Sequence, residues 1–120
     1  MILETLLICW INACAKAEGV NPALARAVFQ VESGDRWHRY RFGPLGKKGQ
    51  YIGPAGIDKS FRAKWDIDFW PMNVLIGVQS LKPRKGERTE KDILRRYNPK
   101  LDRAYEAAVM ALYRQNKRQR

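Results

Sequence analysis

Apolar residues recur at helical spacing in the first part of the chain. Within residues 1–18 they fall three and four positions apart, at Leu3, Leu6, Leu7, Trp10, Ile11 and Cys14. This period is typical of an amphipathic helix. A secretory signal begins with positively charged residues, but no Lys or Arg precedes this apolar run. The run is also too short to span a bilayer. We therefore expect residues 1–18 to form the first helix of the fold.

A second helix is predicted directly after the first. Asn21 is a favourable N-cap, and Pro22 suits the first helical position. Gly34 is expected to end this helix. Its apolar face is predicted to consist of Leu24, Ala27, Val28 and Val31.

The last half of the chain predicts three more helices. One begins near Pro71, and a short one runs from Thr89 to Tyr97, with Asp92 completing a capping box. Asn98-Pro99 ends it. In the helix that begins near Pro71, the residues predicted to face inward are Val74, Leu75, Val78 and Leu81. In the final helix, the residues predicted to face inward are Leu101, Ala104, Tyr105, Ala108 and Leu112.

Helical periodicity disappears between residues 35 and 64. This stretch is punctuated by Gly43, Gly46, Gly49, Gly53 and Gly56, a pattern that indicates turns. A short β-ribbon is the only strand signal, within residues 50–57. The prediction is one mainly α domain spanning residues 1–120, with a long irregular glycine-rich loop and a basic tail at 115–120.

Composition supports a folded, strongly basic protein. The hydrophobic fraction is 45%, with Trp 4, Tyr 5 and Phe 4, which excludes intrinsic disorder. The net charge is +11, from Lys+Arg 23 against Asp+Glu 12. Such a charge favours a polyanionic partner. Nucleic acid, anionic lipid and the acidic bacterial cell wall all fit this description.

Cysteine and histidine chemistry is sparse. Cys9 and Cys14 lie five positions apart, and on a helix their Cα atoms would be roughly 8–9 Å apart, too far for a disulfide. We predict two free, buried thiols. His38 is the single histidine and cannot complete a zinc cluster with them. No metal and no cofactor is predicted.

Glu32 is the residue whose position suggests chemistry. It lies in the last turn of an apolar helix, where the helix dipole disfavours a negative charge. Burial against Val28, Phe29 or Trp37 would also raise its pKa. A carboxyl that keeps its proton at neutral pH can act as a general acid. The alternative is an exposed surface glutamate with a small energetic penalty.

Three segments, in order, resemble motifs of the soluble-lytic-transglycosylase-like (SLT) domain, within the lysozyme-like superfamily that includes goose-type lysozyme. They are Glu32-Ser33-Gly34, the stretch from Asp68 to Leu81 with Pro71, Asn73 and Gly77, and Arg96-Tyr97-Asn98. The resemblance covers residues 20–113. A fourth segment departs from the family pattern of Gly-Leu-Met-Gln, because this chain has Gly56-Ile57-Asp58-Lys59 there.

The resemblance implies cleavage of the β-1,4 bond between N-acetylmuramic acid and N-acetylglucosamine in peptidoglycan, leaving a 1,6-anhydromuramyl product. Glu32 would be the single acid and base. Tyr97 would direct its hydroxyl toward Glu32 or the reacting sugar. From the residues alone, the favoured interpretation of Tyr97 is a core aromatic whose hydroxyl has a polar partner. Substrate contacts would come from Ser33, Ile57, Asp58 and Asn98.

Three alternatives remain open at this point. Asp58 as a second carboxylate would make the protein a hydrolytic lysozyme. A protein that keeps this fold but lacks enzymatic activity would be a wall-binding structural component. Trp37, Tyr40 and Phe42 among arginines are typical of a small nucleic-acid-binding protein. The preferred reading expects a monomer that binds the glycan strand of peptidoglycan, with no nucleic acid and no membrane span. It would act at the cell wall or periplasm, delivered by a phage or a secretion system.

Overall fold

Five α-helices dominate a computed structural model that describes residues 4–32, 44–45, 51–97 and 103–118. They are α1 (Glu4–Glu18), α2 (Pro22–Glu32), α3 (Trp70–Ser80), α4 (Glu90–Tyr97) and α5 (Arg103–Arg118). The mainly α fold is confirmed, and the helix beginning near Pro71 and the short helix before residue 98 lie where the sequence placed them. Across the described parts of the chain, no helix is long and apolar enough to cross a membrane.

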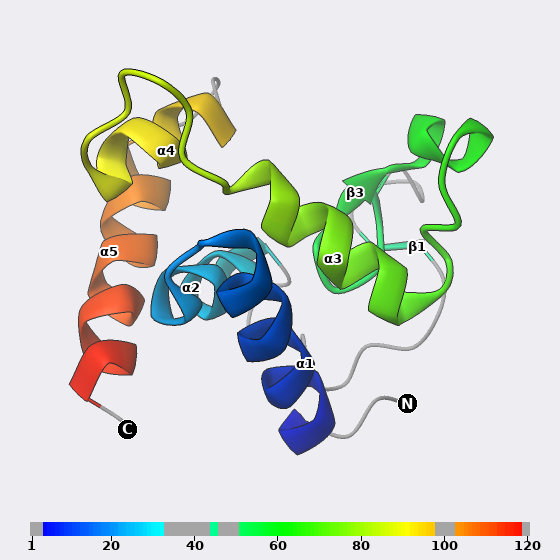
Figure 1. Cartoon of the computed structure of the whole chain (residues 1–120), viewed down its shortest axis with the longest axis horizontal. Helices are drawn as coiled ribbons and strands as arrows, with labels where there is room; N and C mark the ends of the chain where they lie inside the picture. Colours follow the sequence, from blue (N-terminus) through cyan, green and yellow to red (C-terminus); the bar gives the residue numbers. More distant parts are fainter. Residues whose placement is uncertain (1–3, 33–43, 46–50, 98–102, 119–120) are drawn as a thin grey trace.

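Helix α2 lies between α5 and α1, and α1 in turn packs against α3 (Figure 1). The interior is built largely from α2, whose Leu24, Val28 and Phe29 are almost completely buried. Val74, Val78 and Leu81 close the core from α3 and its end, as predicted. Burial of a side chain of this size contributes roughly 1.5–3 kcal/mol.

The beginning of α2 follows the predicted cap. The Asn21 side-chain oxygen accepts the backbone N–H of Ala23 at 2.9 Å and that of Leu24 at 3.4 Å. The Asn21 amide also donates to the hydroxyl of Tyr113 on α5, at 3.3 Å. This cap therefore fixes both the start of α2 and its contact with α5. The predicted stop at Gly34 lies outside the described residues.

Helix α1 has a narrower buried face than the sequence suggested. Leu7, Ile11, Cys14 and Ala15 are buried. Leu6 and Trp10, predicted to point inward, are 52% and 37% exposed. The Trp10 indole lies at the edge of α3, where it donates to the backbone carbonyl of Pro71 at 2.8 Å.

Both cysteines are free, as predicted, but only Cys14 is buried. Cys9 is exposed, so its predicted burial was wrong. Five residues correspond to about 500° of helix rotation, which places the two side chains roughly 140° apart around the axis. They therefore cannot share one face of α1. Burial and, less strongly, the charge of Glu18 raise the pKa of the Cys14 thiol.

Helix α5 buries a different stripe from the predicted one. Val109 and Tyr113 are buried, and Tyr105 and Leu112 pack partly against the core. Ala104 and Ala108 are exposed, and Leu101 lies outside the described residues. The larger side chains of the neighbouring stripe remove more apolar surface from water than two alanines would. That difference rotates the helix away from the predicted face.

Three two-residue strands form a small antiparallel ribbon, which extends beyond residues 50–57, the range in which the sequence indicated one. They are β1 (Pro44–Leu45), β2 (Tyr51–Ile52) and β3 (Ile57–Asp58), in the order β1-β2-β3. In the register, Pro44 faces Ile52 and Tyr51 faces Asp58. A 3-10 helix, η3 (Lys59–Ala63), follows directly.

Asn73 attaches this ribbon to α3. The residue is completely buried. Its oxygen accepts the Ala55 N–H at 2.9 Å, and its amide donates to the carbonyls of Ile52 at 2.8 Å and Ile67 at 3.0 Å. Gly53, at φ +79°, leaves no space for a side chain, because a Cβ there would collide with Asn73. The turn between β2 and β3 is thereby held in place against the core.

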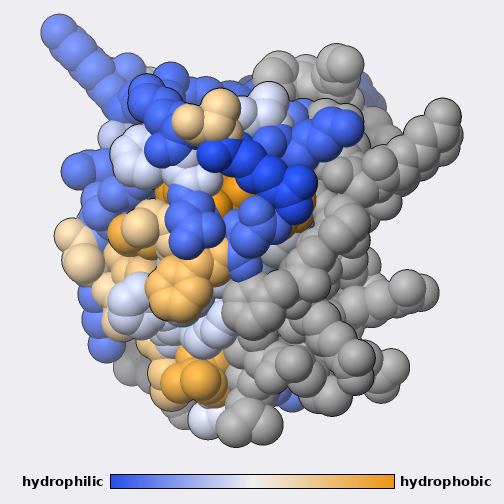
Figure 2. Space-filling view, turned by 90° about the vertical axis from the view of Figure 1, so that its right-hand side faces the viewer, coloured by the Kyte–Doolittle hydropathy of each residue, from blue (hydrophilic) through white to orange (hydrophobic). Residues whose placement is uncertain are grey.

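Several large hydrophobic side chains remain on the surface. They are Leu6, Trp10, Phe61, Trp65 and Phe69. The Lys64 ammonium lies 6.0 Å from the centre of the Trp65 ring. Figure 2 shows one face of the molecule, on which hydrophobic side chains lie among hydrophilic ones.

Candidate active site

Glu32 is the last residue of α2 and is half-buried, so its carboxyl lies where the helix ends. The Tyr105 hydroxyl on α5 donates to Glu32 Oε1 at 2.7 Å. Burial raises the pKa of Glu32, and the hydrogen bond from Tyr105 opposes that rise without cancelling it. The direction agrees with the sequence prediction. A carboxyl with a raised pKa holds its proton to higher pH, as a general acid requires.

Two tyrosines flank this carboxyl. Tyr97 is the last residue of α4, and its pKa is raised by burial and, less strongly, by the nearby charge of Glu32. The same two causes, in the same order, raise the pKa of Tyr105, with smaller contributions from its hydrogen bond and from Tyr97. Both hydroxyls therefore keep their protons at neutral pH. The Tyr97 hydroxyl makes a long contact, 3.5 Å, with the Ala55 carbonyl.

Tyr105 is the neighbour of Glu32 that sequence reasoning missed. It was counted among the inward-facing residues of the last helix, and its spacing gave no reason to separate it from the other members. It belongs to none of the motifs that resemble the SLT domain. The available signal was a hydroxyl at a predicted core position, because a buried tyrosine usually finds a polar partner. That partner is Glu32.

The turn between β2 and β3 lies against the other carboxyl oxygen. A Cβ on Gly56 would be 3.9 Å from Glu32 Oε2 and 4.0 Å from the Glu32 Cβ. Gly56 has φ +61°, a conformation that favours glycine. Glycine at this position places no side chain beside Glu32 Oε2. Ile57, which follows, is half-buried and packs against the core.

Asp58 has a structural task in this arrangement. Its Oδ1 accepts the Ser60 N–H at 2.9 Å and caps η3. No hydrogen bond joins Asp58 to Glu32, and Asp58 is not among the causes of the raised Glu32 pKa. The structure therefore brings Glu32, Tyr97 and the segment at Gly56 together, and places the Asp58 carboxylate at the start of η3. The predicted contacts Ser33 and Asn98 lie outside the described residues.

Glu18 provides a direct contrast to Glu32, because it also ends a helix. Its carboxylate accepts a hydrogen bond from the Gln79 amide at 3.1 Å and lies 3.8 Å from the Lys82 ammonium. Glu32 has no such cationic neighbour within the described residues. Burial favours the neutral form of Glu32.

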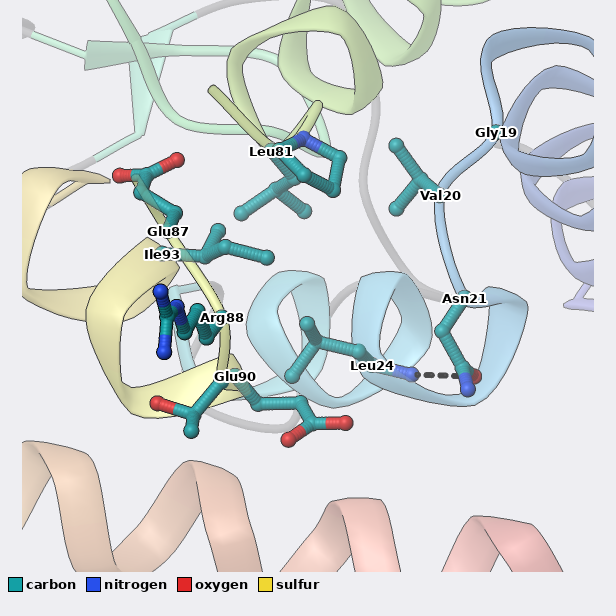
Figure 3. A pocket seen from close by; sticks show the side chains of 11 residues that line it. Gly19, Val20, Asn21, Leu24, Leu81, Glu87, Arg88, Glu90 and Ile93 are labelled. Atoms are coloured by element: carbon teal, nitrogen blue, oxygen red, sulfur yellow. Dashed lines mark hydrogen bonds between the residues drawn. The ribbon is translucent and has the colours of Figure 1, made fainter. Parts of the chain in front are cut away.

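A hollow of about 210 Å³ lies elsewhere, between the α1–α2 turn and the start of α4 (Figure 3). Its apolar floor is formed by Val20, Leu24, Leu81 and Ile93. Its two acids are already engaged: Arg96 donates to Glu87 at 2.7 Å, and Tyr113 donates to Glu90 at 3.0 Å. The bond from Arg96 is the main reason that the pKa of Glu87 is lowered. An acid held ionised in this way is a poor proton donor.

Within the described ranges, no group of three or more His, Cys, Asp or Glu residues could hold a metal ion. Comparison with protein-family models, with curated proteins and with solved structures finds no match for this chain.

Proposed function

We propose that this protein is a peptidoglycan lytic transglycosylase with an SLT-like, lysozyme-like fold. The observation that carries the proposal is the half-buried Glu32 carboxyl at the end of α2, with a raised pKa and a 2.7 Å hydrogen bond from Tyr105. The order of the family-like motifs along the chain supports the same reading. The substrate is the β-1,4 bond between N-acetylmuramic acid and N-acetylglucosamine.

In the proposed reaction Glu32 acts first as an acid and then as a base. Its proton passes to the glycosidic oxygen as the bond from that oxygen to the muramyl anomeric carbon breaks. The muramyl 6-hydroxyl then attacks the anomeric carbon, and the Glu32 carboxylate takes the hydroxyl proton. The carboxyl is regenerated, and the product carries a 1,6-anhydro ring. No water is consumed.

Tyr105 serves as a positioning residue for this cycle. Its hydroxyl donates to Oε1, so the acidic proton is expected on Oε2, the oxygen that faces Gly56. The same bond strengthens when Glu32 is ionised, because hydrogen bonds to charged acceptors are about twice as strong as neutral ones. Tyr105 therefore moderates the rise in the Glu32 pKa and stabilises the carboxylate midway through the reaction.

A single-carboxylate mechanism agrees with the position of Asp58. Ordinary glycosidases use two carboxyl groups on opposite sides of the scissile bond. Asp58 caps η3 instead, and the proposal gives it no proton to transfer. Its side chain supports the β3–η3 corner beside the site.

The basic surface fits action at the cell wall. Carboxylates of the wall peptides and phosphates of teichoic polymers would attract a protein of net charge +11. We place the protein at the wall or periplasm, brought there by a phage or a secretion apparatus. It would work as a monomer on one glycan strand.

The test is release of soluble fragments from purified sacculi by the wild type and by Glu32→Gln. The variant keeps the shape of the side chain but removes the acid, so we expect a rate loss of about a hundredfold to ten-thousandfold. The matched control is Glu18→Gln, the same change at the end of α1, which should retain the wild-type rate. Full activity in Glu32→Gln would refute the assignment.

A further inference from the structure

Arg96, next to the end of α4, is fixed by three hydrogen bonds from its guanidinium. Its Nε donates to Glu87 Oε2 at 2.7 Å, its Nη1 to the Ser80 carbonyl at 2.8 Å and its Nη2 to the Lys82 carbonyl at 2.9 Å. Ser80 is the last residue of α3. Carbonyls at the end of a helix lack partners within the helix and attract a cation. The guanidinium therefore joins the end of α4 to the end of α3.

Glu87, the acidic acceptor of Arg96, is itself held by the loop between α3 and α4. Its Oε1 accepts the backbone N–H of Arg84 at 2.8 Å, while its Oε2 accepts from Arg96. The side chains of Arg96 and Glu87 are only 20% and 13% exposed. Hydrogen bonds between charged groups are stronger than neutral ones, and partly buried charges are screened less by salt. We call this pair, with the carbonyls of Ser80 and Lys82, the Arg96 clamp.

Helix α4 depends on such contacts for its position. It has eight residues, whereas isolated helices shorter than about 12–15 residues are marginal in water. Its buried side chains are Ile93 and Leu94, which attach one side of it to the core. Arg96 follows Leu94 by two positions, or about 200° of helix rotation. The clamp therefore restrains the side of α4 that the apolar contacts leave free, and the two together fix how α4 is rotated.

Tyr97 follows Arg96 directly, so the clamp determines where its ring lies. Consecutive side chains of a helix point about 100° apart. The Tyr97 hydroxyl reaches the Ala55 carbonyl at 3.5 Å, and its ring lies near Glu32. Ala55 is also tied to α3, because the Asn73 oxygen accepts its backbone N–H at 2.9 Å. Helix α3 thus holds both sides of this contact, Ala55 through Asn73 and Tyr97 through Arg96.

We propose that Arg96 is the positioning residue for Tyr97, an inference that rests on the proposed function. Arg96 transfers no proton and contacts no reacting atom; it acts by holding the Tyr97 phenol beside Glu32. Arginine suits this task because its planar guanidinium presents several N–H donors in a fixed fork, which the ammonium of lysine does not reproduce.

The first test is Arg96→Lys, which keeps the positive charge and loses the fork. We expect cleavage of sacculi to slow by about tenfold to a hundredfold, since misplacing a group by about 1 Å can cost about a hundredfold. Arg96→Lys combined with Tyr97→Phe should be no slower than the slower single variant, because both changes remove one interaction. Losses that multiply would show that Arg96 acts through another group and would overturn the inference.

The second test needs no activity. NMR titration of 13C-labelled glutamate carboxyls gives the pKa of Glu32 without substrate, and Glu32→Gln identifies its signal. Burial raises this pKa, and displacement of Tyr97 would let water reach the carboxyl. The pKa of Glu32 should therefore fall toward the ordinary glutamate value in Arg96→Lys. A wild-type Glu32 pKa in the folded variant would overturn the inference.

Arg62→Lys is the matched control. Arg62 on η3 also donates two hydrogen bonds to a carboxylate, that of Asp68, at 2.8 and 2.7 Å. Its loss should leave the cleavage rate and the Glu32 pKa unchanged, even where the melting temperature falls. A bridge that only stabilises the fold predicts the same pattern for Arg96→Lys, and that pattern would contradict the positioning role.

Glu87→Gln perturbs the clamp more gently, because the amide oxygen still accepts from Arg96 but carries no charge. It should shift the cleavage rate and the Glu32 pKa in the same direction as Arg96→Lys, by a smaller amount. Cleavage by the wild type, with no change of rate or of Glu32 pKa in Arg96→Lys, would refute only this inference. A lowered Glu32 pKa in Arg96→Lys, with no cleavage by the wild type, would refute only the proposed activity.

Discussion

Tyr105→Phe removes the hydrogen bond that opposes the rise in the Glu32 pKa. The change removes one hydroxyl, which donates to Glu32 Oε1 at 2.7 Å, and keeps the ring in place. A hydrogen bond to a neutral carboxyl contributes about 0.5–1.5 kcal/mol, and one to a carboxylate about 1.5–3 kcal/mol. The loss in the free energy of unfolding should therefore be about 1 kcal/mol larger where Glu32 is ionised than where it is protonated.

The sign of the pH dependence follows from linkage. The pKa of Glu32 is raised in the folded protein, so its contribution to stability declines as pH rises from the ordinary glutamate pKa through the folded one. The Tyr105 bond lowers the Glu32 pKa, and removing it raises that pKa further. The variant should thus lose more stability toward neutral pH than in acid.

Urea unfolding of the wild type and Tyr105→Phe at several pH values between about 4 and 8 measures this difference. The rate of sacculus cleavage should also fall in the variant, with its pH profile displaced toward higher pH. Tyr113→Phe is the matched control, because Tyr113 donates to the Glu90 carboxylate from the same helix; it should leave cleavage unchanged. A stability loss that is constant or shrinks as pH rises would refute the reasoning.

Three further substitutions test other parts of the account. Tyr97→Phe should slow cleavage without lowering the melting temperature appreciably, because its hydroxyl makes only a 3.5 Å contact; an unchanged rate would return Tyr97 to a packing role. Asp58→Asn should retain most of the activity, since Asp58 caps η3, and a loss as large as that of Glu32→Gln would indicate a two-carboxylate hydrolase. Asn73→Ala removes three buried hydrogen bonds between its side chain and the backbone and should cost roughly 3 kcal/mol or more in thermal or urea unfolding; a loss below about 1 kcal/mol would contradict that role.

Local signals predicted the helices well where they were chemically specific. Asn21 before Pro22 marked the start of α2, because an asparagine side chain satisfies backbone N–H groups there. Glu32 was singled out from its place at a helix end, and its pKa is raised as expected. These features depend on neighbours within one turn of the chain, which a sequence displays directly.

Features that depend on contacts between distant segments were not visible. Tyr105 and Glu32 are 73 positions apart. Periodicity alone identified Tyr105 only as one more inward-facing residue of the final helix. On α5 the apolar stripes overlap, so small differences in side-chain volume decided which one was buried. On α1 the spacing of Leu6 and Trp10 fitted the inward face, but α2 and α3 cover only part of that helix.

The central claim is that Glu32 alone cleaves the glycan by proton transfer, without water. The most direct measurement is mass spectrometry of the fragments released from sacculi in isotopically labelled water. We predict 1,6-anhydromuramyl ends with no label from the wild type, and none of these products from Glu32→Gln. Labelled reducing ends would contradict the transglycosylase mechanism and identify a hydrolase. Intact sacculi after treatment with folded wild-type protein would contradict catalysis itself.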